Sequence, residues 1–235
     1  MIPLRDNIPS SRTPYLNYSL IAINALAFFL ELSTGPHLQQ FIQAFGFVPG
    51  RFVGLLGHLP QALPVMFIPL VTSIFLHGGW LHLIGNMWFL YIFGDNVEDI
   101  LGHGRYLLLY LVSGVGANLI YLIFSPFSLM PLVGASGAVA GVMGAYFFLF
   151  PGARVLTLVP IFLFITVLEL PAYIFLGFWF LLQFLFGAFS GVGPQAGTGG
   201  VAWWAHVGGF LLGILLLYLL SPVRVMNPFR RQERI

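Results

Sequence analysis

Two short sequences carry the side chains best suited to chemistry. Ser136 lies in a Gly-Ala-Ser-Gly sequence at 134–137, and His206 lies in an Ala-His-Val-Gly-Gly sequence at 205–209, each at the head of an apolar stretch. A serine hydroxyl next to a histidine forms a nucleophile with its general base, a pair that supports acyl transfer through a covalent intermediate. Serine by itself is weak support, because it is also one of the small residues that let membrane helices pack closely.

His82 and Asn86 form a second polar pair. Residues four apart lie on one face of a helix, so both side chains can approach the same atom. Either residue alone is more simply explained by a hydrogen bond between helices. Together with a serine and a second histidine they indicate a functional site, since ionisable and amide groups inside a membrane usually have a functional partner.

The composition places these residues in a membrane protein. The chain has 235 residues, of which 59% are hydrophobic and only 7% charged, and its mean hydropathy is +0.95. At roughly 20 residues per crossing, we expect about six or seven spans in a single all-α domain covering residues 1–235. Cysteine is absent, which excludes disulfides and thiolate chemistry, and no basic cluster interleaved with aromatics indicates nucleic acid as a partner.

Hydropathy and charge predict where the chain crosses. The apolar segments are 16–32, 78–93, 106–124, 133–150, 170–189 and 201–220, with a long outer loop at 33–71 that we expect to lie in the membrane interface. A further stretch, 155–168, is ambiguous because it is short for a crossing and contains Pro160.

Arginine placement separates six spans from seven, because cytoplasmic loops collect positive charge. With six spans, only Arg51 lies on the outer side. The arginines on the other side are Arg5, Arg12, Arg105, Arg154, Arg224, Arg230, Arg231 and Arg234. A seventh crossing would divide the arginines almost evenly. We therefore predict six crossings with both termini cytoplasmic, and a loop or interfacial segment at 155–168.

Six crossings bring the polar residues to one depth. Ser136, His206 and His82 then begin the fourth, sixth and second spans, all of which enter from the outer face, at about 5 to 10 Å below their helix starts. Two G-x-x-x-G steps, Gly137 with Gly141 and Gly209 with Gly213, favour close approach of the fourth and sixth spans, although packing alone also explains such steps. Gly134 is expected to help pack the site.

The chain resembles the rhomboid family of intramembrane serine proteases over essentially its whole length. The resemblance rests on TSIFLHGGWLHLIGN at 72–86, the serine sequence at 134–137 and the histidine sequence at 205–209, in this order and spacing. It implies that Ser136 is the nucleophile and His206 the general base. It also implies that His82 and Asn86 contribute to the oxyanion hole and that His77 is structural.

The residues support a Ser/His dyad independently. Most carboxylates fall at the inner side or in the tails: Asp6, Asp95, Glu98, Asp99, Glu169 and Glu233. Glu31 lies near the first outer loop, so none is expected to complete a triad. Asn86, His82 and the Ser136 backbone N–H, at the positive end of the fourth helix, are the expected oxyanion donors.

The chain departs from the family pattern at two places. Ile68 and Pro69 stand where many bacterial rhomboids have a Trp-Arg pair, so that pair's role is lost or taken over by Arg51. Ala140 stands where some members have a tyrosine that stacks on the base, so the orientation of His206 must depend on other groups, with Trp203 or Trp204 as candidates.

The glycine-rich segment 190–200 precedes His206 and is expected to cap the site. The aromatic side chains of 170–189 form either a gate that parts from Trp88 and Phe89 or a plain lipid-facing surface.

Three other functions compete with a protease. A catalytically silent rhomboid-like protein would bind membrane proteins without cutting them, but such relatives typically lack the serine or the histidine. A transporter usually needs intramembrane carboxylates or internal repeats, and the sequence shows neither. A metalloprotease needs zinc ligands at a spacing such as H-E-x-x-H, which His77 and His82 do not match. We expect transmembrane substrates, no metal or cofactor, and a prokaryotic plasma membrane with the site toward its outer face. The sequence does not indicate an oligomeric state.

Overall fold

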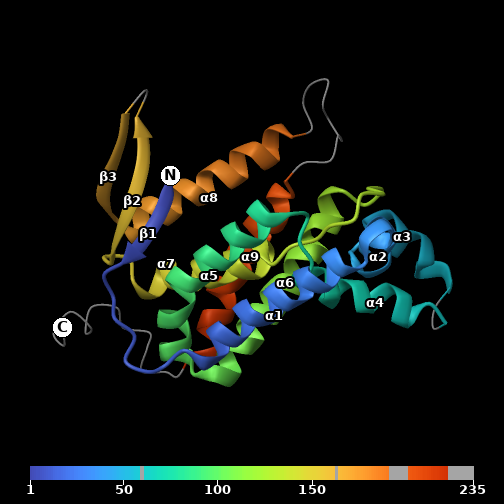
Figure 1. The fold of residues 1–235 in the computed structure, drawn as a ribbon, viewed down its shortest axis with the longest axis horizontal. Helices are drawn as coiled ribbons and strands as arrows, with labels where there is room; N and C mark the ends of the chain where they lie inside the picture. The colour runs from blue at the N-terminus through green and yellow to red at the C-terminus, as the bar shows by residue number, and fades with distance from the viewer. Residues whose placement is uncertain (59–60, 162–163, 191–200, 222–235) are drawn as a thin grey trace.

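Helices form most of the molecule, with one antiparallel sheet at one end (Figure 1). The computed structural model describes residues 1–58, 61–161, 164–190 and 201–221. Its long helices are α1 (Tyr15–Ser33), α5 (Trp80–Leu101), α6 (His103–Phe124), α7 (Ser136–Leu149), α8 (Ala172–Phe189) and α9 (Trp203–Leu220). Shorter helices occupy much of the first connection: α2 (Leu38–Phe45), α3 (Pro49–Leu55) and α4 (Leu63–Thr72), with 3₁₀ turns at Gly35–His37, Leu56–His58 and Ser73–Phe75.

Each predicted apolar segment contains one long helix. The main difference is at α5. The predicted apolar segment ends at residue 93, whereas the helix continues through the charged residues that follow, to Leu101. It ends at Gly102, whose φ of 74° suits glycine at a helix C-terminus. The expected outer loop at 33–71 is largely helical, because its apolar residues form short helices of their own.

The described residues contain four helices that are each long and apolar enough to cross a membrane, namely α1, α6, α8 and α9. A fifth candidate is the pair of α4 with its 3₁₀ turn and α5, which are bent by 77° with respect to each other. The protein is therefore an integral membrane protein. With only 14 residues, α7 is shorter than these helices.

The short helix α7 lies in the middle of the bundle. It packs most extensively against α9 and α6 and also contacts α5 and α8. Its residues 137–146 are all buried. A helix enclosed in this way meets protein rather than lipid, so its length need not match the bilayer thickness.

Glycine permits the close contact between α7 and α9. A methyl group added at Gly209 would lie 2.1 Å from the Gly137 carbonyl oxygen, and one added at Gly213 would lie 1.9 Å from that of Gly141. Both separations are far below van der Waals contact. The two G-x-x-x-G steps thus face each other, and the helix backbones touch directly.

Three strands correct the purely all-α expectation. β1 (Ile2–Asp6), β2 (Arg154–Ile161) and β3 (Phe164–Pro171) form an antiparallel sheet in the order β1-β2-β3. The stretch 155–168, predicted as a loop or interfacial segment, thus belongs to an antiparallel pair of strands that returns to the end of the bundle where it started. Its many β-branched residues favour strands. Pro160 lies beyond the residues that pair with β1, where a strand tolerates proline.

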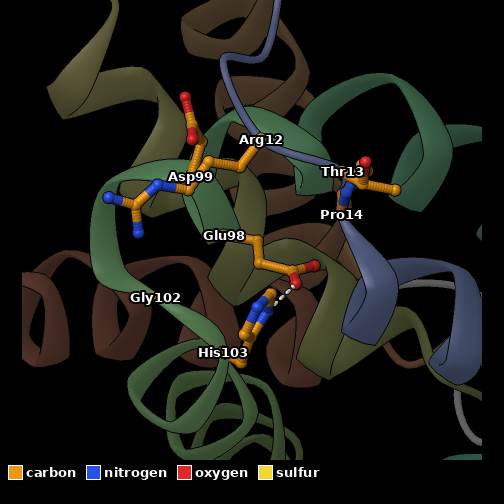
Figure 2. Close-up of a pocket in the computed structure, with 7 residues that line it drawn as sticks. All are labelled: Arg12, Thr13, Pro14, Glu98, Asp99, Gly102 and His103. Carbon is orange, nitrogen blue, oxygen red and sulfur yellow. Dashed lines mark hydrogen bonds and ion pairs between the residues drawn. The ribbon is translucent and has the colours of Figure 1, made fainter.

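Hydrogen bonds gather three distant parts of the chain at the sheet end of the molecule. β1 pairs with β2, and Ser11 donates to Asp99 at the end of α5. Glu98 accepts hydrogen bonds from the backbone N–H groups of Leu16 and Asn17, which lie in the first turn of α1. Figure 2 shows the same carboxylate bonded to His103 in a small pocket beside Arg12 to Pro14.

The opposite end holds the other connections. Phe47, after α2, forms a β-bridge with Leu132, between α6 and α7. In Figure 1 the sheet and helices α2 to α4 lie at opposite ends of the bundle. The N-terminus, the α5–α6 turn and the α7–α8 connection therefore share one end, and the first and third connections share the other.

The α7–α9 contact predicts a clear difference between two glycines. Gly213→Ala should lower the free energy of unfolding by about 1–3 kcal/mol, because the added methyl forces the helices apart. Gly177→Ala in α8 should be neutral or stabilising, since its methyl would lie 3.7 Å from Phe147 and alanine favours a helix. Unfolding titrations in detergent micelles measure both. Equal stability of the two variants would contradict the close contact.

Candidate active site

Ser136 is the first residue of α7. The first N–H groups of a helix have no intrahelical acceptor, and the helix dipole adds partial positive charge at this end. The preceding chain is fixed by Gly134, whose N–H donates to the Ser73 carbonyl at 2.9 Å. The Gly134 φ of 131° is one that other residues rarely adopt. The serine is thus held at a helix N-terminus that favours negative charge.

His82, in the first turn of α5, faces the serine sequence. Its Nδ1 accepts a hydrogen bond from the Gly78 N–H at 3.3 Å, so the proton of the neutral ring lies on Nε2. A methyl group added at Gly134 would lie 2.7 Å from that Nε2 and 3.6 Å from the Ser136 Oγ. The His82 Nε2–H is therefore a donor close to the serine hydroxyl.

Asn86 lies one helical turn beyond His82 on the same helix. Its side chain is 8% exposed, and its Nδ2 has no hydrogen-bond partner among the described residues. A buried amide N–H without an acceptor costs free energy. Such a group is a donor available to an acceptor that enters the site.

His206, in the first turn of α9, is held by a group that the sequence analysis missed. Its Nδ1 lies 2.7 Å from the Oε1 of Gln183 on α8. The rings of Trp179 and Trp203 lie 6.0 Å and 6.2 Å from the imidazole. Trp203 thus fits the expected supporting role, whereas Trp204 stacks on Phe124.

A sequence signal for Gln183 does exist. It is the only amide or charged residue of the apolar segment 172–189. A single polar side chain in such a segment is a reason to look for a partner. The identity of that partner was not readable, because it depends on how α8 and α9 are rotated against each other.

Ser136 and His206 come from backbones in direct contact. A methyl group at Gly137, next to the serine, would lie 3.8 Å from the carbonyl oxygen of Ala205, next to the histidine. Within the described part of the chain, no hydrogen bond joins the serine hydroxyl to the imidazole. The starts of α7 and α9 are therefore neighbours.

His77 and Glu31 form a buried contact behind the site. The His77 backbone N–H donates to the Glu31 Oε1 at 2.9 Å, and the His77 ring lies edge-on to His82 at 5.2 Å. Glu31 thus ties α1 to the link before α5. It makes no hydrogen bond to His206 in the described residues.

The remaining expected positions lie apart from this cluster. Ile68 is exposed on α4 and Pro69 is buried there, while Arg51 donates to the Gln43 carbonyl in the first connection. The expected cap at 190–200 falls outside the described residues from 191 onward, as do Arg224, Arg230, Arg231, Arg234 and Glu233.

Comparison with known proteins identifies the class. The fold and the polar cluster define a helical membrane protein with a candidate site at the starts of α5, α7 and α9. A model of the Rhomboid domain matches residues 64–223. This range includes every candidate site residue and more than half of the chain, so the chain belongs to the rhomboid family, whose proteases act on transmembrane substrates within the bilayer.

Its relatives include proteins named as proteases. The Rhomboid protease GluP of Bacillus subtilis is 35% identical over 133 residues, covering 56% of this chain and 24% of that protein. Rhomboid protein 1, mitochondrial, of Saccharomyces cerevisiae is 27% identical over 223 residues, covering 93% and 57%. Rhomboid-like protein 11, chloroplastic, of Arabidopsis thaliana is 49% identical over 71 residues, covering 30% and 25%. The chain thus spans from a quarter to a little over half of the length of these relatives.

The relatives come from a bacterium, a mitochondrion and a chloroplast. Their diversity gives no support to the expectation of a prokaryotic plasma membrane in particular.

Gly134 provides a test of the site geometry. In Gly134→Ala the methyl would lie 2.6 Å from the His82 Cε1, and the φ of 131° would strain alanine. We expect labelling of Ser136 by a fluorophosphonate to slow by about tenfold or more, because the serine and its nearest donor are both displaced. Gly54→Ala is the matched control, because its methyl would meet no atom of the described residues within 4 Å. Wild-type labelling of Gly134→Ala would contradict the geometry.

Proposed function

We propose that this protein is an intramembrane serine endopeptidase that cleaves transmembrane segments through a Ser136/His206 dyad. Four observations support it: the rhomboid domain match, a serine at a helix N-terminus, a histidine on the adjoining helix start, and two donors nearby. The observation that carries most weight is Asn86, a buried amide whose Nδ2 has no hydrogen-bond partner in the described part of the chain.

The first half-reaction forms an acyl-enzyme. The Ser136 Oγ attacks the carbonyl carbon of the scissile peptide while its proton passes to the Nε2 of His206. The resulting oxyanion accepts hydrogen bonds from the Asn86 Nδ2–H, the His82 Nε2–H and the Ser136 backbone N–H. As the tetrahedral intermediate collapses, the C–N bond breaks and the leaving nitrogen takes the proton from His206.

The second half-reaction returns the enzyme to its starting state. His206 takes a proton from a water molecule, whose oxygen attacks the ester carbonyl. The same donors hold the second oxyanion. The ester C–O bond then breaks, the product acid leaves, and the proton returns to the Ser136 oxygen. The lack of a Ser136–His206 hydrogen bond among the described residues is compatible with this role, because catalytic hydrogen bonds often tighten only when substrate binds.

The membrane arrangement that we propose has six crossings, by α1, α5, α6, α7, α8 and α9, in one rhomboid-like domain. Supporting it, the N-terminal strand, the α5–α6 turn and the α7–α8 hairpin share one end, and the first and third connections share the other. Arg5, Arg12, Arg105 and Arg154 belong to the first end and Arg51 to the second. Because positively charged loops favour the cytoplasm, we propose that the first end faces the cytoplasm. Ser136 lies at the second end and would then face outward.

Substrates of this site are membrane proteins whose helix opens near the cut. An extended segment must reach Ser136, so small residues that weaken a helix favour cleavage. Water reaches the acyl-enzyme from the outer end of the bundle.

Removal of either member of the dyad provides the direct test. Ser136→Ala and His206→Ala should each lower cleavage of a reconstituted transmembrane substrate by several orders of magnitude, because a nucleophile and its base act as a unit. Asn86→Ala should lose about 10- to 10³-fold, the usual effect of one oxyanion donor. The measurement is initial rate in proteoliposomes, with thermal stability of each variant as the control for folding.

The same preparation separates the competing functions. A fluorophosphonate should label wild type and leave Ser136→Ala unlabelled, and chelators should leave cleavage unchanged. A folded wild type that binds membrane proteins without cutting them, in proteoliposomes that support a known rhomboid protease, would instead indicate the catalytically silent alternative.

Entry of substrate between α5 and α8 is a further part of the proposal. These helices meet through aromatic rings, with Phe89 stacked on Phe175 at 6.4 Å. Phe178, Phe184 and Phe186 are each a little under half exposed. The indole of Trp88, the other expected member of this contact, donates a hydrogen bond to the Pro3 carbonyl.

Crosslinking tests this entry route. The chain has no cysteine, so Phe89→Cys with Phe175→Cys creates a unique pair for a short linker that bonds to each thiol through a reducible disulfide. We expect the crosslink to abolish cleavage of transmembrane substrates and to spare labelling by a small fluorophosphonate, with reversal on reduction. Each single-cysteine variant treated with the same reagent is the control. Full cleavage in the crosslinked state would exclude this route.

A further inference from the structure

Gln183 is a buried polar residue that the proposed mechanism does not use. It lies on α8, a helix that contributes no other group to the reaction, and its side chain is only 7% exposed. Burying an amide among apolar side chains is unfavourable unless its polar atoms are bonded. Its Oε1 is bonded, at 2.7 Å, to the Nδ1 of His206.

The chemistry of this contact defines the state of the imidazole. An amide oxygen can only accept a hydrogen bond, so the His206 Nδ1 must carry the proton. A neutral imidazole has one N–H, and its Nε2 is then the unprotonated nitrogen. That nitrogen is the one that must take the Ser136 proton.

We propose that Gln183 is the positioning residue of the dyad, holding His206 in the tautomer and ring orientation in which Nε2 accepts the serine proton. This inference rests on the proposed function. Gln183 supplies from a third helix what a carboxylate supplies in a Ser-His-Asp triad, but without a charge to desolvate.

The surroundings of His206 restrict the ring further. Trp179 lies beside it on the same helix as Gln183, four residues earlier and therefore on the same face. Trp203 meets the ring edge-on from α9 itself, with an interplanar angle of 90°. The aromatic rings limit tilting of the imidazole, and the hydrogen bond selects which of its nitrogens points away from α8.

Because Gln183 lies on α8, the orientation of His206 depends on how α8 packs against α9. α8 packs more extensively against α9 than against α7, and the Gln183–His206 bond lies in this contact. Parting of α8 from α5 leaves the bond intact as long as α8 remains on α9. The base therefore stays oriented while substrate enters from the α5 side.

Two substitutions separate positioning from bulk. Gln183→Met keeps the length and most of the volume but has no oxygen acceptor, whereas Gln183→Glu keeps an oxygen in place. Leu181→Met, on the same helix and 48% exposed, is the matched control for introducing methionine. We expect kcat to fall about 10- to 100-fold in Gln183→Met with KM nearly unchanged, as for loss of one buried hydrogen bond in the transition state. Gln183→Glu should retain most of the rate.

Two further measurements do not depend on the entry of a large substrate. Fluorophosphonate labelling of Ser136 should slow in Gln183→Met by the same factor as kcat. Nitrogen-15 NMR of the imidazole, assigned by comparison with His206→Ala, should show the Nδ1–H tautomer in wild type and a shift toward Nε2–H in Gln183→Met.

Three results would overturn the inference: wild-type labelling in folded Gln183→Met, equal loss in the Met and Glu variants, or the same tautomer in wild type and Gln183→Met. If Ser136→Ala abolishes cleavage while Gln183→Met does not slow it, only this inference fails. If Ser136→Ala still cleaves, the proposed function itself fails.

Discussion

The direct contact between the backbones of α7 and α9 is the constraint on which the candidate site depends. At Gly209 and Gly213 the carbonyl oxygens of α7 lie where a side chain would otherwise stand. Because this contact begins at the first turns of both helices, it also fixes where Ser136 and His206 stand relative to each other. Any larger residue along this line would separate the helices and, with them, the two groups. Packing and chemistry therefore place the same demand on these glycines.

The two histidines nearest Ser136 share one arrangement. In each ring the Nδ1 is hydrogen-bonded, in His82 to the Gly78 N–H and in His206 to Gln183. This bonding defines the proton positions, leaving one Nε2 as a donor and the other as an acceptor. The Asn86 Nδ2 adds a second donor, which no other described residue engages. In a medium of low polarity such directed groups interact strongly with an entering charge, which gives the site its preorganisation.

Residues before the matched domain also support the site. The rhomboid match starts at residue 64, yet α1 lies earlier, and its Glu31 accepts the His77 N–H just before α5. At the other end of α1, Glu98 of α5 accepts from the first-turn N–H groups, as a capping carboxylate does. Each end of α1 is thus bonded to α5 or to the link before it, and this contact steadies the helix that carries His82 and Asn86.

Local patterns in the sequence were sufficient to predict the apolar segments, the shared face of His82 and Asn86, and the glycine steps. Each of these features follows from the spacing of residues within one segment. The hairpin at Arg154–Pro171 was missed because its stability comes partly from β1, a partner from the other end of the chain. Its β-branched residues were the local sign. The partners of Gln183 and Glu31 were decided only by tertiary structure. A side chain in an apolar helix can bond to any neighbour, and the choice depends on helix rotation and depth, which no single segment determines.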